Sequence, residues 1–229
     1  MKKFHAIPFA LILMVSCNNA RKSSENIQNN ETVTIENLTT PEKIANANGY
    51  ANWENVSEIQ FTFNVNREGK HFERSWIWKP KTDAVTMISE KNTISYNRSK
   101  MDSIIMKSDA AFINDKYWLL APFQLVWDEG TAFSEKQNVV APISKDILDQ
   151  LTVVYGTQGG YTPGDAYDFF YDENFKIREW NYRRQNSEAI SMSTTWEEYE
   201  NFEGLEISTM HKDSTANFEL YFTNISVKK

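Results

Sequence analysis

The chain has 229 residues, a formal net charge of −7, one cysteine, and an aromatic content of 14% that includes seven tryptophans. The single cysteine excludes an intrachain disulfide. The acidic balance and the lack of a basic cluster argue against nucleic-acid binding. They also argue against attachment to an anionic membrane through a polybasic patch.

The first 16 residues have the pattern of a secretory signal peptide. Lys2 and Lys3 precede an apolar segment, 4–15, that is shorter than the roughly 20 residues of a membrane-spanning helix. The segment ends in residues 14–17 (MVSC), which resemble a bacterial lipobox, so we expect residues 1–16 to be removed and Cys17 to carry a lipid. The alternative is an ordinary signal peptide with an incidental cysteine.

Residues 17–40 are rich in Asn, Ser, Thr and Glu and show no core-forming period, so they predict a polar tether behind the lipidated cysteine. Residues 41–229 have no internal repeat and no second low-complexity segment. Their number suits one domain with a sizeable core, so we expect a single domain over 41–229.

A helix is predicted over 40–48, with Thr40 as its cap and Gly49 as its terminator. Alternating apolar residues then predict a strand over 59–65, a turn at 67–70 and a second strand over 72–78. Further strands are expected at 84–89, 93–97, 151–155, 166–171, 176–183, 189–196, 205–211 and 218–227. Between 99 and 147 the pattern loosens, with helical or irregular segments at 99–107 and 114–120. A type II turn is expected at 162–165, with a positive φ at Gly164.

A long antiparallel sheet with an interruption in its middle can form a sandwich or a curved sheet wrapped around helices. Bulky aromatic residues fall on the predicted strands, and little else in the sequence can cover them: Trp76, Trp78, Trp180, Tyr182 and Trp196. This favours a mainly β (α+β) fold in which a long curved antiparallel sheet forms a half-open barrel wrapped around a few short helices.

Three segments resemble uncharacterised lipoproteins of Bacteroidota: 112–123 (FINDKYWLLAPF), 160–165 (GYTPGD) and 222–225 (FTNI). The order of elements behind the lipobox also resembles the LolA/LolB-like superfamily, the outer-membrane lipoprotein carriers and receptors. This resemblance implies a half-barrel whose cavity takes acyl chains. It also implies a lipid anchor in the outer membrane of a bacterial cell envelope. Because no acidic residue follows Cys17 before Glu25, the same comparison implies that the domain faces the periplasm.

The resemblance makes an apolar small molecule or lipid the expected partner, and aromatic and methionine side chains suit such a lining. The candidates for the cavity wall are Trp76, Trp78, Trp118, Trp127, Trp180, Tyr182, Met192 and Trp196. The alternative is that these residues fill a packed core. The protein would then be a non-catalytic interaction or structural lipoprotein that engages an unidentified envelope partner.

Catalysis, a metal and a cofactor are not expected. Only His71 and His211 follow the predicted cleavage site, and each is isolated in a predicted strand. No nucleophile elbow, zinc-protease motif, phosphate loop or dinucleotide fingerprint is present. A carboxylate set, Asp165, Asp168 and Asp172, is explained by a solvated strand face.

Overall fold

The structure, a computed structural model, describes residues 37–158, 161–215 and 217–229. Thr34–Lys229 is a compact unit, and the described residues belong to it. The predicted signal peptide, Cys17 and most of the expected 17–40 tether lie outside the described residues.

Two α-helices and several short 3₁₀ helices accompany the strands. The α-helices are α1 (Thr40–Ala47) and α2 (Ile105–Trp127). The 3₁₀ helices are η2 (Tyr50–Asn55), η3 (Pro80–Thr82), η4 (Arg98–Lys100) and η5 (Arg184–Asn186).

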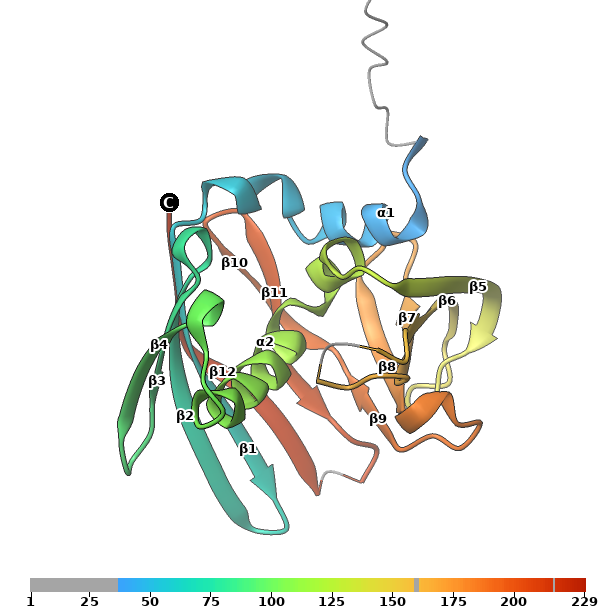
Figure 1. Ribbon diagram of the computed structural model, residues 1–229. Coiled ribbons are helices and arrows are strands. Elements are labelled where there is room, and N and C mark those ends of the chain that lie inside the picture. The colour runs from blue at the N-terminus through green and yellow to red at the C-terminus, as the bar shows by residue number, and fades with distance from the viewer. Residues whose placement is uncertain (1–36, 159–160, 216) are drawn as a thin grey trace, which may run out of the picture. The chain divides into compact units, whose positions relative to one another are not determined.

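The strands form two antiparallel sheets (Figure 1). The first has seven strands in the order β10-β11-β12-β1-β2-β3-β4, so the first and last strands of the domain are neighbours. Its members are β1 (Glu58–Arg67), β2 (Lys70–Lys79), β3 (Ala84–Ile88), β4 (Thr93–Asn97), β10 (Glu197–Phe202), β11 (Leu205–Lys212) and β12 (Phe218–Lys228). The second has five strands in chain order: β5 (Thr131–Val140), β6 (Ile147–Tyr155), β7 (Ala166–Tyr171), β8 (Ile177–Arg183) and β9 (Met192–Thr195).

The predicted mainly β, antiparallel fold class with few helices is confirmed, with the strands divided between two sheets. The chain passes from one sheet to the other at Trp196, which lies between β9 and β10 and donates its backbone N–H to Arg178 O at 2.7 Å. Close to this point, the Thr195 hydroxyl accepts the backbone N–H of Lys212 from β11 at 3.0 Å. The two sheets are therefore joined directly where the chain crosses.

Helix α2 packs against both sheets and so separates two apolar cores (Figure 1). Phe112, Leu119 and Phe123 belong to the core on the seven-stranded side. Ala121 and Leu125 belong to the core on the five-stranded side, together with Ile44 of α1. One long helix thus takes the place of the short segment expected at 114–120, and of the segment expected at 99–107 only residues 105–107 belong to it.

Some local predictions are confirmed and others are wrong. Gly49 ends α1 with φ 86°, and Gly164 has φ 81°, as expected for residues without a Cβ. The helix cap is Thr39 and not Thr40, because the Thr39 N–H donates to the carboxylate of Glu42, three residues into the helix, at 2.7 Å.

The predicted solvated face at Asp165 and Asp168 is also wrong, since both carboxylates are buried. Asp168 accepts hydrogen bonds from the Thr152 hydroxyl at 2.7 Å and from Arg183 Nε at 3.0 Å. Asp165 accepts from the Tyr182 hydroxyl at 2.8 Å. Strand alternation turned the Asp168 carboxylate away from Tyr167 and Phe169, as predicted, but polar neighbours cover that side of the strand as well.

Candidate ligand-binding site

The position of α2 is fixed by a buried ion pair with β2. Asp115 of α2 is fully buried and accepts from Arg74 Nη2 at 2.6 Å and Nε at 2.5 Å. The Trp76 indole N–H donates to the same carboxylate at 2.8 Å. A buried carboxylate requires such partners. The side chains of Arg74, Trp76 and Asp115 therefore hold the helix against the seven-stranded sheet.

A second buried carboxylate, Asp109, holds the first turns of α2. Arg98, in η4 directly after β4, donates to it from Nε at 2.9 Å. The hydroxyls of Tyr96 and Tyr161 also donate to it, at 3.0 Å and 2.8 Å. Asp109 therefore connects the start of α2 to three segments of the chain, β4, η4 and the segment after β6.

Farther along α2, Leu120 has non-helical backbone angles (φ −127°, ψ 24°), two residues before Pro122. Proline has no N–H for the ladder and its ring collides with the preceding turn, which accounts for the distortion.

An apolar pocket of about 330 Å³ lies between α2 and the two sheets. We call it the apolar pocket. Its size is at the lower end of the range of roughly 300–1,000 Å³ for small-molecule sites. The wall comes from β1, α2, β7, β8, β9, β12 and the segment after β6, and consists of Phe63, Val65, Ala110, Ile113, Asn114, Tyr117, Trp118, Tyr161, Thr162, Tyr167, Trp180, Tyr182, Met192, Phe218 and Leu220.

The structure brings four of the eight expected lining residues together in this wall: Trp118, Trp180, Tyr182 and Met192. Trp127 lines a neighbouring polar pocket instead. The other three, Trp76, Trp78 and Trp196, are buried and line neither the apolar pocket nor the polar one. Trp76 and Trp78 pack on Phe112 of α2, with ring centroids 5.3 and 5.6 Å away.

The sequence analysis missed several wall residues because it selected mainly tryptophans as candidates and left out phenylalanine and aliphatic residues. Phe63 and Val65 alternate on one face of β1, and Phe218 and Leu220 do so on β12. Since β1 and β12 are neighbours, Val65 is opposite Leu220 in the ladder. The alternation in each strand shows that these residues share a face. Only the pairing of β1 with β12 shows that the two faces lie side by side.

Stacked aromatic rings form the floor of the apolar pocket. The rings of Tyr117, Tyr167 and Trp180 all contact one another, with centroid distances of 4.7, 5.1 and 5.9 Å, and Trp118 meets the Trp180 ring at 4.4 Å. Behind Trp118 lies the buried imidazole of His211, 5.3 Å from it. Burial lowers the pKa of His211 to about 3, so this ring is neutral and adds apolar surface.

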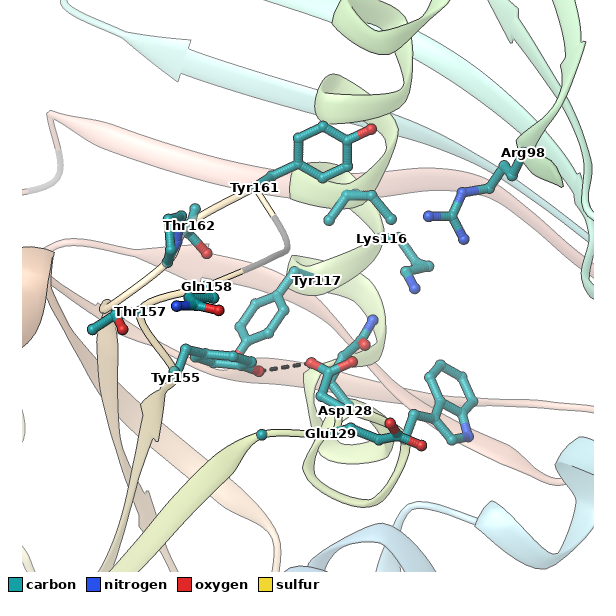
Figure 2. Close-up of a pocket in the computed structure, with 16 residues that line it drawn as sticks. Arg98, Lys116, Tyr117, Asp128, Glu129, Tyr155, Thr157, Gln158, Tyr161 and Thr162 are labelled. Atoms are coloured by element: carbon teal, nitrogen blue, oxygen red, sulfur yellow. Dashed lines mark hydrogen bonds between the residues drawn. The ribbon is translucent and has the colours of Figure 1, made fainter. Parts of the chain in front are cut away.

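The polar pocket, of about 500 Å³, is adjacent and shares Ile113, Tyr117, Tyr161 and Thr162 with the apolar pocket. Arg98 and Lys116 lie on one side of it, opposite Tyr155, Gln158 and Thr162 (Figure 2). The Tyr155 hydroxyl donates to Asp128 Oδ2 at 2.8 Å.

Titration in the polar pocket is dominated by burial. Burial lowers the pKa of Lys116 to about 8, and the nearby charge of Arg98 acts in the same direction. Burial also raises the pKa of Asp128, against the hydrogen bond from Tyr155. Both shifts disfavour the charged form of the side chain, as expected in a poorly solvated site.

No protein-family model and no curated protein matches the sequence. Among solved structures, the chain is similar to a LolA superfamily protein from Nitrosomonas europaea, with 8% identity and a TM-score of 0.49 over 84% of this chain and 95% of the other. It is similar to a DUF1329 family protein from Desulfovibrio piger, with 10% identity and a TM-score of 0.47 over 82% and 92% of the two chains. A putative outer membrane lipoprotein-sorting protein domain from Vibrio parahaemolyticus gives 8% identity and a TM-score of 0.45 over 82% and 94%.

In the described part of the chain, no group of three or more His, Cys, Asp or Glu side chains is arranged to hold a metal ion. Among the same residues, no helix combines the length and the apolar character that crossing a bilayer requires.

Proposed function

We propose that this protein is a lipid-anchored component of a bacterial cell envelope that binds an apolar ligand, of the acyl-chain class, in the apolar pocket. The observation that carries the proposal is the wall itself, in which Trp118, Met192 and Phe218 border open space and are only partly buried. Residues of a filled core would cover one another. Burial of each methylene of a chain in such a pocket contributes about 0.8 kcal/mol.

No catalytic step is part of the proposal. The polar groups that border the apolar pocket are mainly tyrosine hydroxyls, and burial raises the pKa of Tyr182 to about 12, so it remains a neutral donor at physiological pH. Anchoring through Cys17 on the periplasmic face of the outer membrane would keep the domain within reach of lipid.

The test uses the full chain carrying Cys17→Ser, so that the protein's own lipid cannot occupy the pocket. Binding of a fluorescent fatty acid is measured for this protein and for Met192→Glu and Met192→Leu. Met192 lies at the start of β9 in the pocket wall. A carboxylate there meets an apolar surface and should abolish binding, whereas leucine keeps the apolar volume.

The matched control is Met210→Glu, because Met210 is also a partly buried strand methionine but lines neither the apolar pocket nor the polar pocket. It should bind like the parent protein. Absence of fatty-acid binding by the parent, or equal binding by folded Met192→Glu and Met192→Leu, would sink the proposal.

A second candidate function, engagement of an envelope partner through the outer surface, is favoured by the start of α2. Ile104 is 80% exposed and Met106 is 51% exposed, so this end of the helix presents two large apolar side chains to solvent. Replacing both with serine should reduce partner capture by crosslinking in cells and leave fatty-acid binding unchanged. Undiminished crosslinking would exclude this surface.

A further inference from the structure

The polar pocket contains a buried cation that no carboxylate neutralises directly. Lys116 is only 7% exposed, yet no carboxylate oxygen of the described residues lies within 4.0 Å of its ammonium group. With the Gln124 amide oriented to satisfy both of its neighbours, the Gln124 carbonyl accepts from Lys116 Nζ at 3.0 Å and its NH₂ group donates to Asp128 at 2.8 Å. One neutral acceptor is little compensation for a desolvated ammonium group.

Aromatic rings take part of the remaining space around the ammonium. Lys116 Nζ lies 5.2 Å from the Trp78 ring centroid and 5.6 Å from that of Trp127. Such contacts orient a lysine and stabilise its charge modestly, but they supply no counter-ion.

A second cation, Arg98, borders the same pocket. Its Nε and Nη2 atoms point to Asp109, so it is held rigidly on that side. The charge of Arg98 disfavours the charged form of Lys116, whereas the more distant carboxylates of Asp128 and Asp109 favour it. An anion bound between these two cations would relieve their mutual repulsion.

The carboxylates near the pocket are already engaged or lie at its rim. Asp109 is bound by Arg98 and two tyrosine hydroxyls, and Asp128 by Tyr155 and Gln124. Glu129 lines the pocket but is exposed. None of these groups replaces a counter-ion in contact with Lys116.

The two pockets meet at the side chains that they share, Ile113 and Tyr117 of α2 and Tyr161 and Thr162. One molecule can therefore extend from one pocket to the other across this border. We propose that the ligand is an anionic amphiphile, with its chain in the apolar pocket and its carboxylate or phosphate head between Lys116 and Arg98. This inference rests on the proposed function and specifies the chemistry of the ligand.

The experiment compares probes of equal chain length: dodecanoate, dodecyl phosphate and dodecanol, with inorganic phosphate as a head group without a chain. Affinities are measured by calorimetry for the Cys17→Ser full chain. Dodecanoate and dodecyl phosphate should bind roughly tenfold or more tightly than dodecanol, the scale of a charge-assisted hydrogen bond in a desolvated site. Inorganic phosphate should not compete at similar concentrations, because it gains nothing from the apolar pocket.

The variant Lys116→Met should bind dodecanol like the parent and should lose most of the preference for the anions. Lys107→Met is the matched control, because Lys107 is an exposed lysine of the same helix that lines neither pocket. It should retain the full preference. If Lys116→Met fails to fold, Lys116→Gln serves in its place, and the comparison of probes on the parent protein tests the inference in any case.

The preference should also depend on pH. Because burial lowers the pKa of Lys116 to about 8, the ammonium loses its proton as pH rises through that value, and dodecanoate affinity should fall toward that of dodecanol between pH 7 and 9.5. The other titratable groups near Lys116 are Arg98, Asp109, Asp128, Glu129, Tyr117, Tyr155 and Tyr161. Burial raises the pKa values of Tyr117 and Tyr155, so these hydroxyls stay neutral over this range.

Equal affinity of the parent for dodecanoate and dodecanol would overturn the inference and leave the apolar pocket's proposed function intact. Tight binding of inorganic phosphate alone would overturn it in favour of a site for free phosphate. Binding of none of the chain-bearing probes would instead remove the proposed function.

Discussion

The replacement Arg74→Met should destabilise the protein strongly because it leaves a buried carboxylate without its cation. Asp115 is fully buried and receives two guanidinium hydrogen bonds from Arg74, of 2.5 and 2.6 Å, so only the Trp76 indole and the Asn114 amide would remain as its donors. Removing one partner of a buried ion pair costs about 3–5 kcal/mol. Since Arg74 and Asp115 fix α2 against β2, binding of a fatty acid should weaken as well.

Urea unfolding at pH 7 measures the loss, with Arg67→Met as the control. Arg67 and its neighbour Glu68 are both largely exposed and 4.0 Å apart, so this variant should change the free energy of unfolding by less than about 1 kcal/mol. Burial raises the pKa of Asp115, and the deficit of Arg74→Met should therefore shrink as pH falls and the folded protein takes up a proton there. A loss below about 1 kcal/mol at pH 7, or a deficit that grows on acidification, would refute this account of the ion pair.

Three further predictions address the anchor, a turn and a buried base. Cys17→Ser should abolish incorporation of a palmitate analogue in metabolic labelling, and undiminished label would mean that Cys17 is not the acylation site. Gly164→Val should lower the free energy of unfolding by about 1–3 kcal/mol, because Gly164 has φ 81° and valine resists that conformation; Gly164→Asn should lose less, since asparagine tolerates positive φ. As pH falls from 6.5 toward 3, His211 takes up a proton in the unfolded chain but not in the folded protein, so the free energy of unfolding should fall by up to about 1.4 kcal/mol per pH unit. In urea unfolding, His211→Phe should reduce this dependence on pH.

The sequence was most informative where local pattern and tertiary environment agree. The strands predicted at 59–65 and 72–78 are β1 and β2, because apolar residues alternate along each of them and their turn contains residues that adopt positive φ, Glu68 at 51° and Gly69 at 74°. The helix over 40–48 was visible for a similar reason, since proline at its start and glycine after its end are both local signals.

The missed elements lack such a signal. Strand β5 is exposed along nearly all of its length and is the edge of its sheet, so no face of it needs apolar residues. Helix α2 contacts two cores, and apolar residues therefore surround it instead of forming one stripe, while Pro122 suggests an end where the helix only bends. The polar pocket could not be predicted at all, because Arg98, Lys116 and Tyr155 come together only through the packing of η4 and β6 around α2.

The two ion pairs that α2 makes within the described residues have a mechanical consequence. Both reach the seven-stranded side, through Arg74 of β2 and Arg98 after β4. Toward the five-stranded sheet, α2 presents mainly rings and aliphatic groups, such as Trp118 against Trp180, with a hydroxyl contact in which Tyr155 of β6 donates to Tyr117 at 3.0 Å. Ion pairs resist sliding because their geometry is directional, whereas apolar contacts re-form at many offsets. The helix should therefore move as one body with the seven-stranded sheet, and a small shift of the five-stranded sheet along it would change the depth of the apolar pocket, so that one protein could accept chains of different lengths.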